Sequence, residues 1–520
     1  MPRCVGFLIV AAAALAITGC AGTGNPQIAD QAAPVAQRAD AFPEGDSVPA
    51  GSEAGTVEPP APDSTQAAAD DSVKTIDLHR YRFGLEQAIR WAMANNISLL
   101  NARDQVSRSR FNVRAAAAEF EVKITPQANV GLAGGAGGTN AAHGAGLELS
   151  RKSTVGTAAS VSGTTSDSGG ANNTTNLGIT LTQPLLYGLG KEVNKDPLLD
   201  AEFGVLTTER SYVQFQENLT VSVVRSFYEI VKQRELLELS RKSAERTSGH
   251  VAAAKAREKV GLASRIDVLR GEIQLRQAED ALLSAEQAYG DAVDNLRVLL
   301  GFGPQDDVEI DADLAYTDFA IDTDRAIEMA MFNRLDLAQA RDEIIEAERN
   351  LRVAKNRTLP QLDLVLGYNR YGVGSSFSES SSLSDSSWTI GLSTATDVRR
   401  TAERAYYEQS KLDLESRERN NRLMGYNAAR EVKDGIRRME KNRKRIDVQQ
   451  AEIDLARQKL RLARMKFERG LGDNFDLVTA EEELLRAESN HVAAVTDYIV
   501  SQVEVKKAIG TLVEKPERLK

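Results

Sequence analysis

The residues that could do chemistry in this chain are few and poorly spaced for catalysis. Its two cysteines, Cys4 and Cys20, both lie in the first twenty residues, so the rest of the chain has no cysteine nucleophile, thiolate metal site or disulfide. The four histidines lie far apart in the sequence, without the short spacing typical of metal ligands. The sequence also contains no recognisable nucleophile–base pair or phosphate-binding loop. It therefore predicts that the protein is not an enzyme and has no cofactor.

Cys20 is the residue with the clearest chemical expectation. Arg3 and an apolar run from Val5 to Ala16 precede it, which is the pattern of a secretory signal peptide. The small residues ending in Cys20 resemble a bacterial lipoprotein signal. This resemblance implies cleavage before Cys20 and a covalent lipid, including palmitate, on that residue. Ala21 follows, not the Asp that retains lipoproteins at the inner membrane, so the same resemblance implies the outer membrane of a Gram-negative bacterium. A signal peptide without lipidation is the alternative.

Charge and composition argue against a nucleic-acid binder and a compact enzyme, and they predict one disordered segment. The net charge of −10 does not favour a nucleic-acid binder, which needs a basic surface, and aromatic residues (5%) are few for a compact enzyme of 520 residues. Residues 21–75 are rich in Ala, Pro, Gly, Asp and Glu and show no apolar periodicity. We expect this segment to be a disordered acidic tether.

Two aspartates, Asp267 and Asp476, occupy matching positions in a duplicated segment. Residues 261–301 return without a gap as residues 470–510, and each copy opens on Gly-Leu and closes on Gly. A duplication of this length indicates two-fold repetition of a large unit.

Within both copies, large and small residues recur at heptad spacing. Small residues in such a seam let helix backbones approach closely, as in coiled coils. One copy alone could be an ordinary amphipathic core helix, but two copies in register favour a coiled-coil hairpin. The large positions are Val268, Leu275, Leu282, Tyr289 and Leu296 in the first copy and Leu477, Leu484, His491, Tyr498 and Val505 in the second.

A second duplicated helix, expected at about Leu85–Glu121 in the first half, runs into Pro-Gln in both halves. Beyond each proline the apolar period changes to two, with small polar residues on the other face. This pattern is typical of strands between lipid and water, and a half-buried hairpin of a soluble protein is the alternative. We expect strands at about 124–183 and 360–394. Residues 133–175 and 374–387 are predicted to be hairpin loops, the first with room for an extra short hairpin.

The longest helices are expected at about 196–258 and 400–468, each on the order of 100 Å long. Each ends at a Gly-Leu turn, where glycine is a favoured helix stop. Two shorter helices placed end to end match one long helix, which favours a tall cylinder of antiparallel helices. The expected domains are a first repeat at 76–301, a linker at 302–322, a second repeat at 323–510 and a tail at 511–520.

These features together resemble the lipoprotein branch of the TolC-type outer membrane efflux proteins. The resemblance rests on the duplication, the helix–strand–strand–helix order, LTQPLLYG at 181–188 and the Gly-Leu…Asp turns. It implies a mainly α fold with a membrane β-barrel portion. Two tandem repeats would supply long antiparallel coiled-coil helices to a trimeric α-barrel, continuous with a shared β-barrel of twelve strands, four per chain.

The same resemblance implies the function and the partners. The homotrimer would be the passive exit duct of a tripartite efflux or type I secretion system, anchored in the outer membrane and extending into the periplasm. A periplasmic adaptor would join it to an inner-membrane transporter that supplies the energy. The alternative is a soluble or lipid-anchored periplasmic coiled-coil adaptor or scaffold, which would carry one helical hairpin within β-rich domains.

The family's functional residues fall at the two turns of this sequence. Pore-entrance candidates are Asp476, Asp473 and Asp267; a second aspartate position of the family falls on Thr479. Purely structural roles are the alternatives: the leucines of the turns would pack on their neighbours, and the aspartates would stabilise a helix N-terminus. The adaptor-contact residues implied by the resemblance are Gly261, Leu262, Ala263, Ser264, Gly470, Leu471, Gly472 and Asp473.

One stretch departs from the family pattern. Residues 394–404 lack the Pro-Leu that stands at 184–185. We therefore expect the strand-to-helix junction to differ between the two halves.

Overall fold

The computed structural model describes residues 80–135, 138–167, 173–261, 264–303, 306–469, 471 and 474–519. The chain divides into two compact units, Met1–Val73 and Lys74–Lys520, and every described residue belongs to the second. The signal segment, Cys20 and the tether therefore lie outside the described residues.

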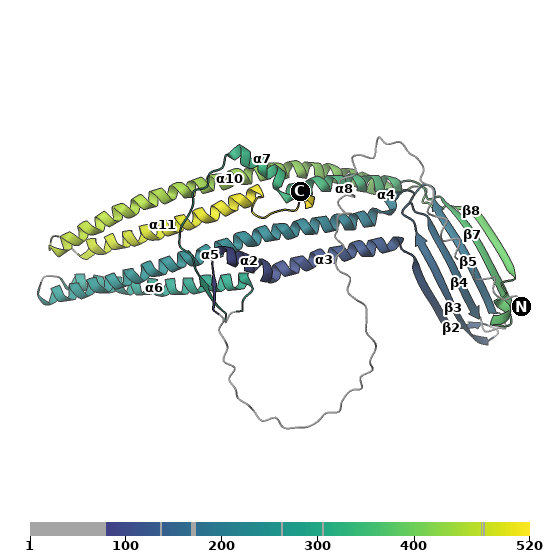
Figure 1. Ribbon diagram of the computed structural model, residues 1–520, viewed down its shortest axis with the longest axis horizontal. Coiled ribbons are helices and arrows are strands. Elements are labelled where there is room, and N and C mark those ends of the chain that lie inside the picture. Colours follow the sequence, from purple (N-terminus) through teal and green to yellow (C-terminus); the bar gives the residue numbers. More distant parts are fainter. Residues whose placement is uncertain are drawn as a thin grey trace, which may run out of the picture. The chain divides into compact units, whose positions relative to one another are not determined.

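Eight helices of the second unit form two matching sets (Figure 1). Each set has two shorter helices, then a long helix, then a helix that returns along it. The expected mainly helical fold with a sheet portion is confirmed. The first set is α2 (Leu85–Asn95), α3 (Ile97–Ala117), α5 (Asp196–Lys259) and α6 (Arg265–Leu300), and the second is α7 (Thr323–Asn333), α8 (Leu335–Arg357), α10 (Thr401–Glu468) and α11 (Asn474–Ile509).

The single helix expected at Leu85–Glu121 is two helices with a break at Asn96. The Asn96 side chain caps α3 by accepting a hydrogen bond from the Leu99 amide (3.0 Å) and donates to the Leu299 carbonyl of α6 (2.9 Å). Asparagine is a favoured N-cap because its oxygen satisfies an amide that has no partner within the helix. A break at Arg334 separates α7 from α8 in the second repeat.

Helix packing gives the order of the helical layer. α5 packs against α3 and α6 on one side and against α11 on the other, and α10 packs against both α8 and α11. The layer therefore runs from α3 and α6, through α5, then α8 and α11, to α10. Two main apolar cores fill it, one around Phe227 and Leu296 and the other around Val432 and Tyr498. Among the described residues, none of the helices has an apolar stretch long enough to cross a membrane.

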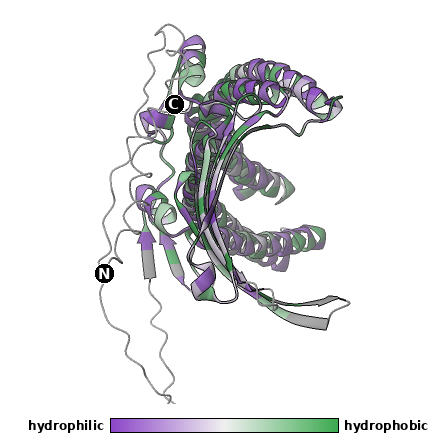
Figure 2. Ribbon diagram, turned by 90° about the vertical axis from the view of Figure 1, so that its right-hand side faces the viewer, coloured by the Kyte–Doolittle hydropathy of each residue, from purple (hydrophilic) through white to green (hydrophobic). Residues whose placement is uncertain are grey.

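One antiparallel sheet of six strands continues from the helices, in the order β2-β3-β4-β5-β7-β8. Figure 2 shows that these strands curve together as one layer, with hydrophobic and hydrophilic residues interspersed along them. Short helices lie at its ends: a 3-10 turn at Ala118–Phe120, α4 (Lys191–Asn194) and α9 (Phe377–Ser380). The strands are β2 (Lys123–Gly135), β3 (Gly138–Lys152), β4 (Ala158–Asp167), β5 (Asn173–Pro184), β7 (Asp363–Gly374) and β8 (Asp385–Ser393).

Residues 133–175, predicted to be a hairpin loop with room for an extra short hairpin, are mostly strand where the structure describes them. This stretch holds β3 and β4, two long strands that pair along most of their length with each other and with β2 and β5. Its Gly, Ala, Ser and Thr residues suit turns when taken singly, but in alternation they also suit a strand with one small polar face. The described residues therefore supply six strands to this sheet, where the resemblance implies four.

The segment between the repeats also forms strand structure that the sequence pattern did not reveal. β6 (Asp307–Ile310) pairs in parallel with β1 (Arg80–Phe83). Phe83 and Ile310 enter the core of the first repeat. This small sheet ties the start of the folded unit to the linker expected at 302–322.

Candidate functional site

The tip of the first helical hairpin is a short turn between α5 and α6. Gly261 adopts φ +76°, a left-handed conformation that glycine reaches without strain. Ser264 then begins α6, and its hydroxyl oxygen accepts a hydrogen bond from the Asp267 amide (3.2 Å). Leu262 and Ala263 lie outside the described residues.

Asp267 completes this cap. Its carboxylate accepts hydrogen bonds from the Ser264 hydroxyl (2.6 Å) and the Ser264 amide (3.2 Å). These hydrogen bonds lower the pKa of Asp267. The geometry is a capping box, in which the side chains at both ends of the first turn satisfy amides without helical partners. The Asp267 carboxylate thus has a structural use at the start of α6.

The tip of the second hairpin exposes apolar side chains. Leu471 is 77% exposed, and Phe475, in the first turn of α11, is 60% exposed. Asp476 follows as an exposed acidic residue of the same turn, and Thr479 is half-buried. Gly470, Gly472 and Asp473 lie outside the described residues.

Three exposed apolar residues at the tips were missed by the sequence interpretation. Val260 and Ile266 flank the first turn, and Phe475 follows the second. Both tips lie at the end of the helices away from the sheet (Figure 1). The signal was present in the sequence as apolar residues immediately beside the Gly-Leu turns, outside the heptad series.

Direct contacts join the two hairpins near these tips. The Arg257 guanidinium of α5 donates to the Phe467 carbonyl of α10 (3.0 Å) and lies 4.1 Å from the centroid of the Phe467 ring. His250 of α5 lies 2.8 Å from the carboxylate of Glu481 on α11. The structure therefore brings the second hairpin against the long helix of the first.

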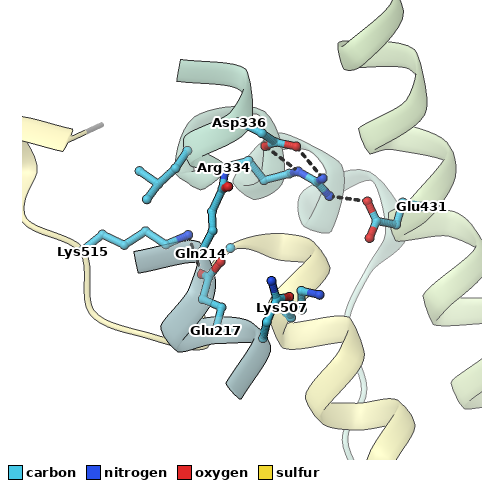
Figure 3. A pocket seen from close by; sticks show the side chains of 10 residues that line it. Gln214, Glu217, Arg334, Asp336, Glu431, Lys507 and Lys515 are labelled. Atoms are coloured by element: carbon cyan, nitrogen blue, oxygen red, sulfur yellow. Dashed lines mark hydrogen bonds and ion pairs between the residues drawn. The ribbon is translucent and has the colours of Figure 1, made fainter. Parts of the chain in front are cut away.

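A polar cavity of about 220 Å³ lies where both repeats and the C-terminal tail meet (Figure 3). Arg334 donates to both carboxylate oxygens of Asp336 (3.1 and 2.8 Å) and to Glu431 of α10 (2.7 Å). Burial disfavours both charges of the first pair, but the hydrogen bonds outweigh it, so the pKa of Arg334 is raised and that of Asp336 is lowered. Lys515 of the tail pairs with Glu217 of α5 (2.8 Å). These ion pairs tie the elements around the cavity together.

The sheet presents apolar side chains on one face. Ile179, Tyr368 and Trp388, on β5, β7 and β8, are exposed and lie in one row of the ladder. Polar residues such as Asn369 alternate with them. Within the described ranges, no group of three or more His, Cys, Asp or Glu side chains is arranged to hold a metal ion.

Comparison with known proteins places these features in a family. The model of the family described as "Outer membrane efflux protein" matches residues 88–302 and 326–511, that is, both repeats. The outer membrane protein TolC of Vibrio cholerae is 26% identical over 329 residues, which cover 61% of this chain and 73% of TolC. The fusaric acid resistance protein FusA of Burkholderia cepacia is 27% identical over 174 residues, 33% of each chain.

Solved structures show the same fold at low sequence identity. The CmeC outer membrane channel of Campylobacter jejuni matches with a TM-score of 0.66 at 15% identity, over 83% of this chain and 87% of CmeC. The outer membrane protein VceC of Vibrio cholerae matches with a TM-score of 0.65 at 15% identity, over 82% of this chain and 96% of VceC. Because the family model matches more than half of the chain, across both repeats, the chain belongs to the outer membrane efflux protein family, whose members are the outer membrane channels of tripartite efflux systems.

Proposed function

We propose that three copies of this chain close into one tube, the passive exit duct of a tripartite efflux or type I secretion system. The observation that carries the proposal is that each edge strand of the sheet connects to a helix at the corresponding side of the helical layer. Within the described residues, β2 and β8 each pair with a strand on one side only. β2 follows α3, and β8 leads into α10, so each edge of the sheet continues into one flank of the helical layer.

Both helical flanks carry exposed apolar side chains among their charged residues. Contact between one flank and the other flank of the next copy is heterologous, and such contacts form a closed ring when the rotation closes. The same rotation would pair β8 of one copy with β2 of the next and leave no sheet edge in the membrane, where unpaired backbone groups are costly. The exposed apolar residues include Ile273, Leu283 and Val298 on α6 and Leu412, Leu455 and Leu462 on α10.

The hairpin tips are the proposed contact with a periplasmic adaptor, which joins the duct to an inner-membrane transporter. The exposed Leu471, Val260 and Phe475 support this assignment because an apolar tip can be covered by the apolar groove of a partner. The proposed contact residues are Gly261 to Ser264 at the first tip and Gly470 to Asp473 at the second.

Asp476 and Asp473 are the proposed acidic residues of the pore entrance. In a trimer each would give a ring of three carboxylates, whose field favours cations. Asp267 stays a weaker candidate because its carboxylate already caps α6. The chain is proposed to be anchored in the outer membrane by lipid on Cys20 and to extend its helices into the periplasm.

The experiment that tests the duct is the mass and shape of the detergent-solubilised protein, by light scattering and negative-stain imaging. We expect a three-chain particle in which a helical tube on the order of 100 Å long extends from a detergent belt. A monomer, or an elongated particle that stays soluble without detergent after Cys20 is replaced, would contradict the duct. That result would support the periplasmic adaptor or scaffold instead.

A further inference from the structure

The first repeat gives four strands to the six-stranded sheet and the second gives two. We propose that β3 and β4 are part of the membrane wall, so that three copies close an eighteen-stranded barrel with an outlet as wide as the helical tube. The inference rests on the proposed trimeric duct. It replaces the twelve strands that the resemblance implies with three sets of the six strands observed.

One row of the ladder shows that β3 and β4 share the apolar face of the other strands. The row runs without interruption from the first strand to the last, and every member is apolar or aromatic. Because side chains alternate faces along a strand, a slip of one residue would move a strand's apolar residues to the other face. All six strands are therefore in phase. The row is Ile124, Leu149, Val161, Ile179, Tyr368 and Trp388.

The next residue along each strand lies on the opposite face, and there the row is small or polar across all six strands. Gln127 on this face also donates to Glu148 (3.2 Å) across β2 and β3. Lipid-facing and lumen-facing residues alternate in this way in membrane barrels. If the β3–β4 hairpin lay in water beside the membrane strands, it would need no apolar face in register with theirs. The row is Thr125, Glu148, Ser162, Gly178, Asn369 and Ser387.

The charged residues of the apolar face lie to either side of the apolar row. Arg151 of β3 lies on the helix side and donates to the Phe120 carbonyl (3.4 Å). Arg370 of β7 lies on the far side and donates to the Leu383 carbonyl (2.7 Å). Long basic side chains at these levels can reach the membrane interfaces while the apolar row lies in lipid.

The turn between β3 and β4 is built into the base of the sheet. The Gly190 amide donates to the Val155 carbonyl (3.2 Å), which ties the turn to the segment that follows β5. Gly156 has φ +101°, and a Cβ there would lie 2.6 Å from the Gly188 carbonyl oxygen. Lys152 pairs with Glu119 (2.7 Å) at the end of the preceding helix. The hairpin is thus fixed at the helix–sheet junction, at the same level as the other strands.

The circumference of the two layers agrees with six strands per chain. Strands about 4.8 Å apart and tilted by about 40° give six strands about 38 Å of circumference, whereas four strands give about 25 Å. Four helical columns about 8–10 Å apart give about 32–40 Å. Because barrel diameter grows roughly linearly with strand number, the outlet would be about 1.5 times as wide as a twelve-stranded one. Cargo that passes along the helical tube would then meet no narrowing at the exit.

Single cysteines in β4 test whether this hairpin lies in the wall. Trimers carrying Val161→Cys or Ser162→Cys are reconstituted in liposomes and treated with a charged, membrane-impermeant thiol reagent, with the parent chain as the blank. We expect Ser162→Cys to react at least about tenfold faster than Val161→Cys, because one side chain faces the lumen and the other faces lipid. Equal rates at the two positions would overturn the inference.

The matched control makes the same comparison on β5, with Ile179→Cys on the apolar face and Thr180→Cys on the opposite face. If β5 alternates and β4 does not, the sheet is a membrane wall but β3 and β4 stand outside it, and only the further inference fails. If neither strand alternates, the sheet is not a membrane wall, and the proposed function fails with the inference.

Removal of residues 138–167 tests the pore size directly. This deletion leaves β2 and β5 to pair with each other, with Ile124 and Ile179 still on one face. We expect electron cryo-microscopy to show eighteen strands in the full trimer and a barrel circumference smaller by about one third in the variant. An equal circumference in the two would overturn the inference, and if the variant yields no trimers the strand count of the full chain decides.

Discussion

The two repeats have nearly the same helices and different sheets. Each has a broken helix pair, a long helix of 64 or 68 residues and a returning helix of 36 residues, yet the first repeat gives twice as many strands to the six-stranded sheet as the second. Helix length is constrained because both hairpins must reach the same end. A hairpin adds two strands and returns the chain to the side where it started, so the sheet can widen without disturbing the helices.

The junctions from sheet to long helix also differ, as the sequence predicted. After β5 the chain forms α4, and the Asn194 side chain donates to the Gly188 and Gly190 carbonyls (2.7 and 2.9 Å). After β8 the chain reaches α10 through Arg400, which has φ +50° and donates to the Arg357 carbonyl (2.7 Å). The first junction thus has a short extra helix, where the β3–β4 turn also docks, and the second has one strained arginine.

The largest expected effect comes from Arg349, which joins α8 of the second repeat to the start of α5 in the first. Its buried guanidinium contacts Asp196, Asp200 and Glu346. Arg349→Met would leave the largely buried carboxylates of Asp196 and Glu346 without their cation, which typically costs about 3–5 kcal/mol. We expect thermal unfolding of the variant at clearly lower temperature. The control is Arg352→Met. Arg352 lies on the same helix as Arg349 and forms an exposed ion pair with Glu192 of α4, so its loss should cost at most about 1 kcal/mol. Equal effects of the two variants would contradict the role of Arg349.

Gly156 tests the turn that only the first repeat has. Gly156→Ala would place a methyl group against the Gly188 carbonyl at a positive φ, so we expect a loss of about 1–3 kcal/mol in stability. Gly391→Ala in β8, where a Cβ would have no atom within 4 Å, should cost little. Thermal unfolding of both variants measures the difference. Wild-type stability of Gly156→Ala would show that the turn is not fixed to the junction.

The duplication made most of the helical structure predictable. Two copies in register identified the α6 and α11 seams, and Val268, Leu296, Leu477 and Tyr498 are buried as expected. The break at Asn96 was not predicted; its cap on the Leu99 amide is local, but the hydrogen bond that ties Asn96 to the Leu299 carbonyl of α6 spans about two hundred residues. A contact of that kind leaves no local pattern in the sequence.

The sheet and the site were harder to predict. β3 and β4 consist mostly of small residues, with Leu147, Leu149 and Val161 as their large apolar residues, so their apolar face emerges only once the register with β2 and β5 is known. At the tips, glycine and leucine marked both turns. The capping role of Asp267 followed from its place in a first helical turn, whereas exposure of Val260 and Phe475 requires knowledge of how the hairpins end.

The two tips should differ in what they contribute to adaptor binding. Leu471 is the more clearly exposed tip residue among those described, so we expect Leu471→Ser to weaken adaptor binding about tenfold, the loss of one apolar contact of about 1.4 kcal/mol. The matched change, Leu262→Ser, tests the first tip. Binding is measured by surface plasmon resonance with trimers verified by light scattering. Wild-type adaptor affinity in the double variant would remove both leucines from the contact.

Asp267 and Asp476, which occupy matching positions in the two copies, should have different roles, one in stability and the other in ion conduction. Asp267→Asn removes the carboxylate that caps α6, so we expect a loss of about 0.5–2 kcal/mol in stability with little change in conductance. Asp476→Asn should raise single-channel conductance or reduce cation preference in planar bilayers, with a smaller change in stability. The reverse pattern would exchange the two roles.

The smallest expected effect is a pH dependence confined to the second hairpin. Burial lowers the pKa of His491 by more than a hydrogen bond with the Ile446 backbone raises it. The folded state therefore favours the neutral ring, and its contribution to stability is complete above the unfolded pKa of about 6.5 and is lost as pH falls below it. The matching residue of the first copy is Leu282, which does not titrate. We expect hydrogen exchange in α10 and α11 to accelerate between pH 7.5 and pH 5 relative to α5 and α6, after correction for the intrinsic rates, and His491→Leu to remove this difference. Equal pH dependence in the variant would mean that other groups set the stability of this hairpin.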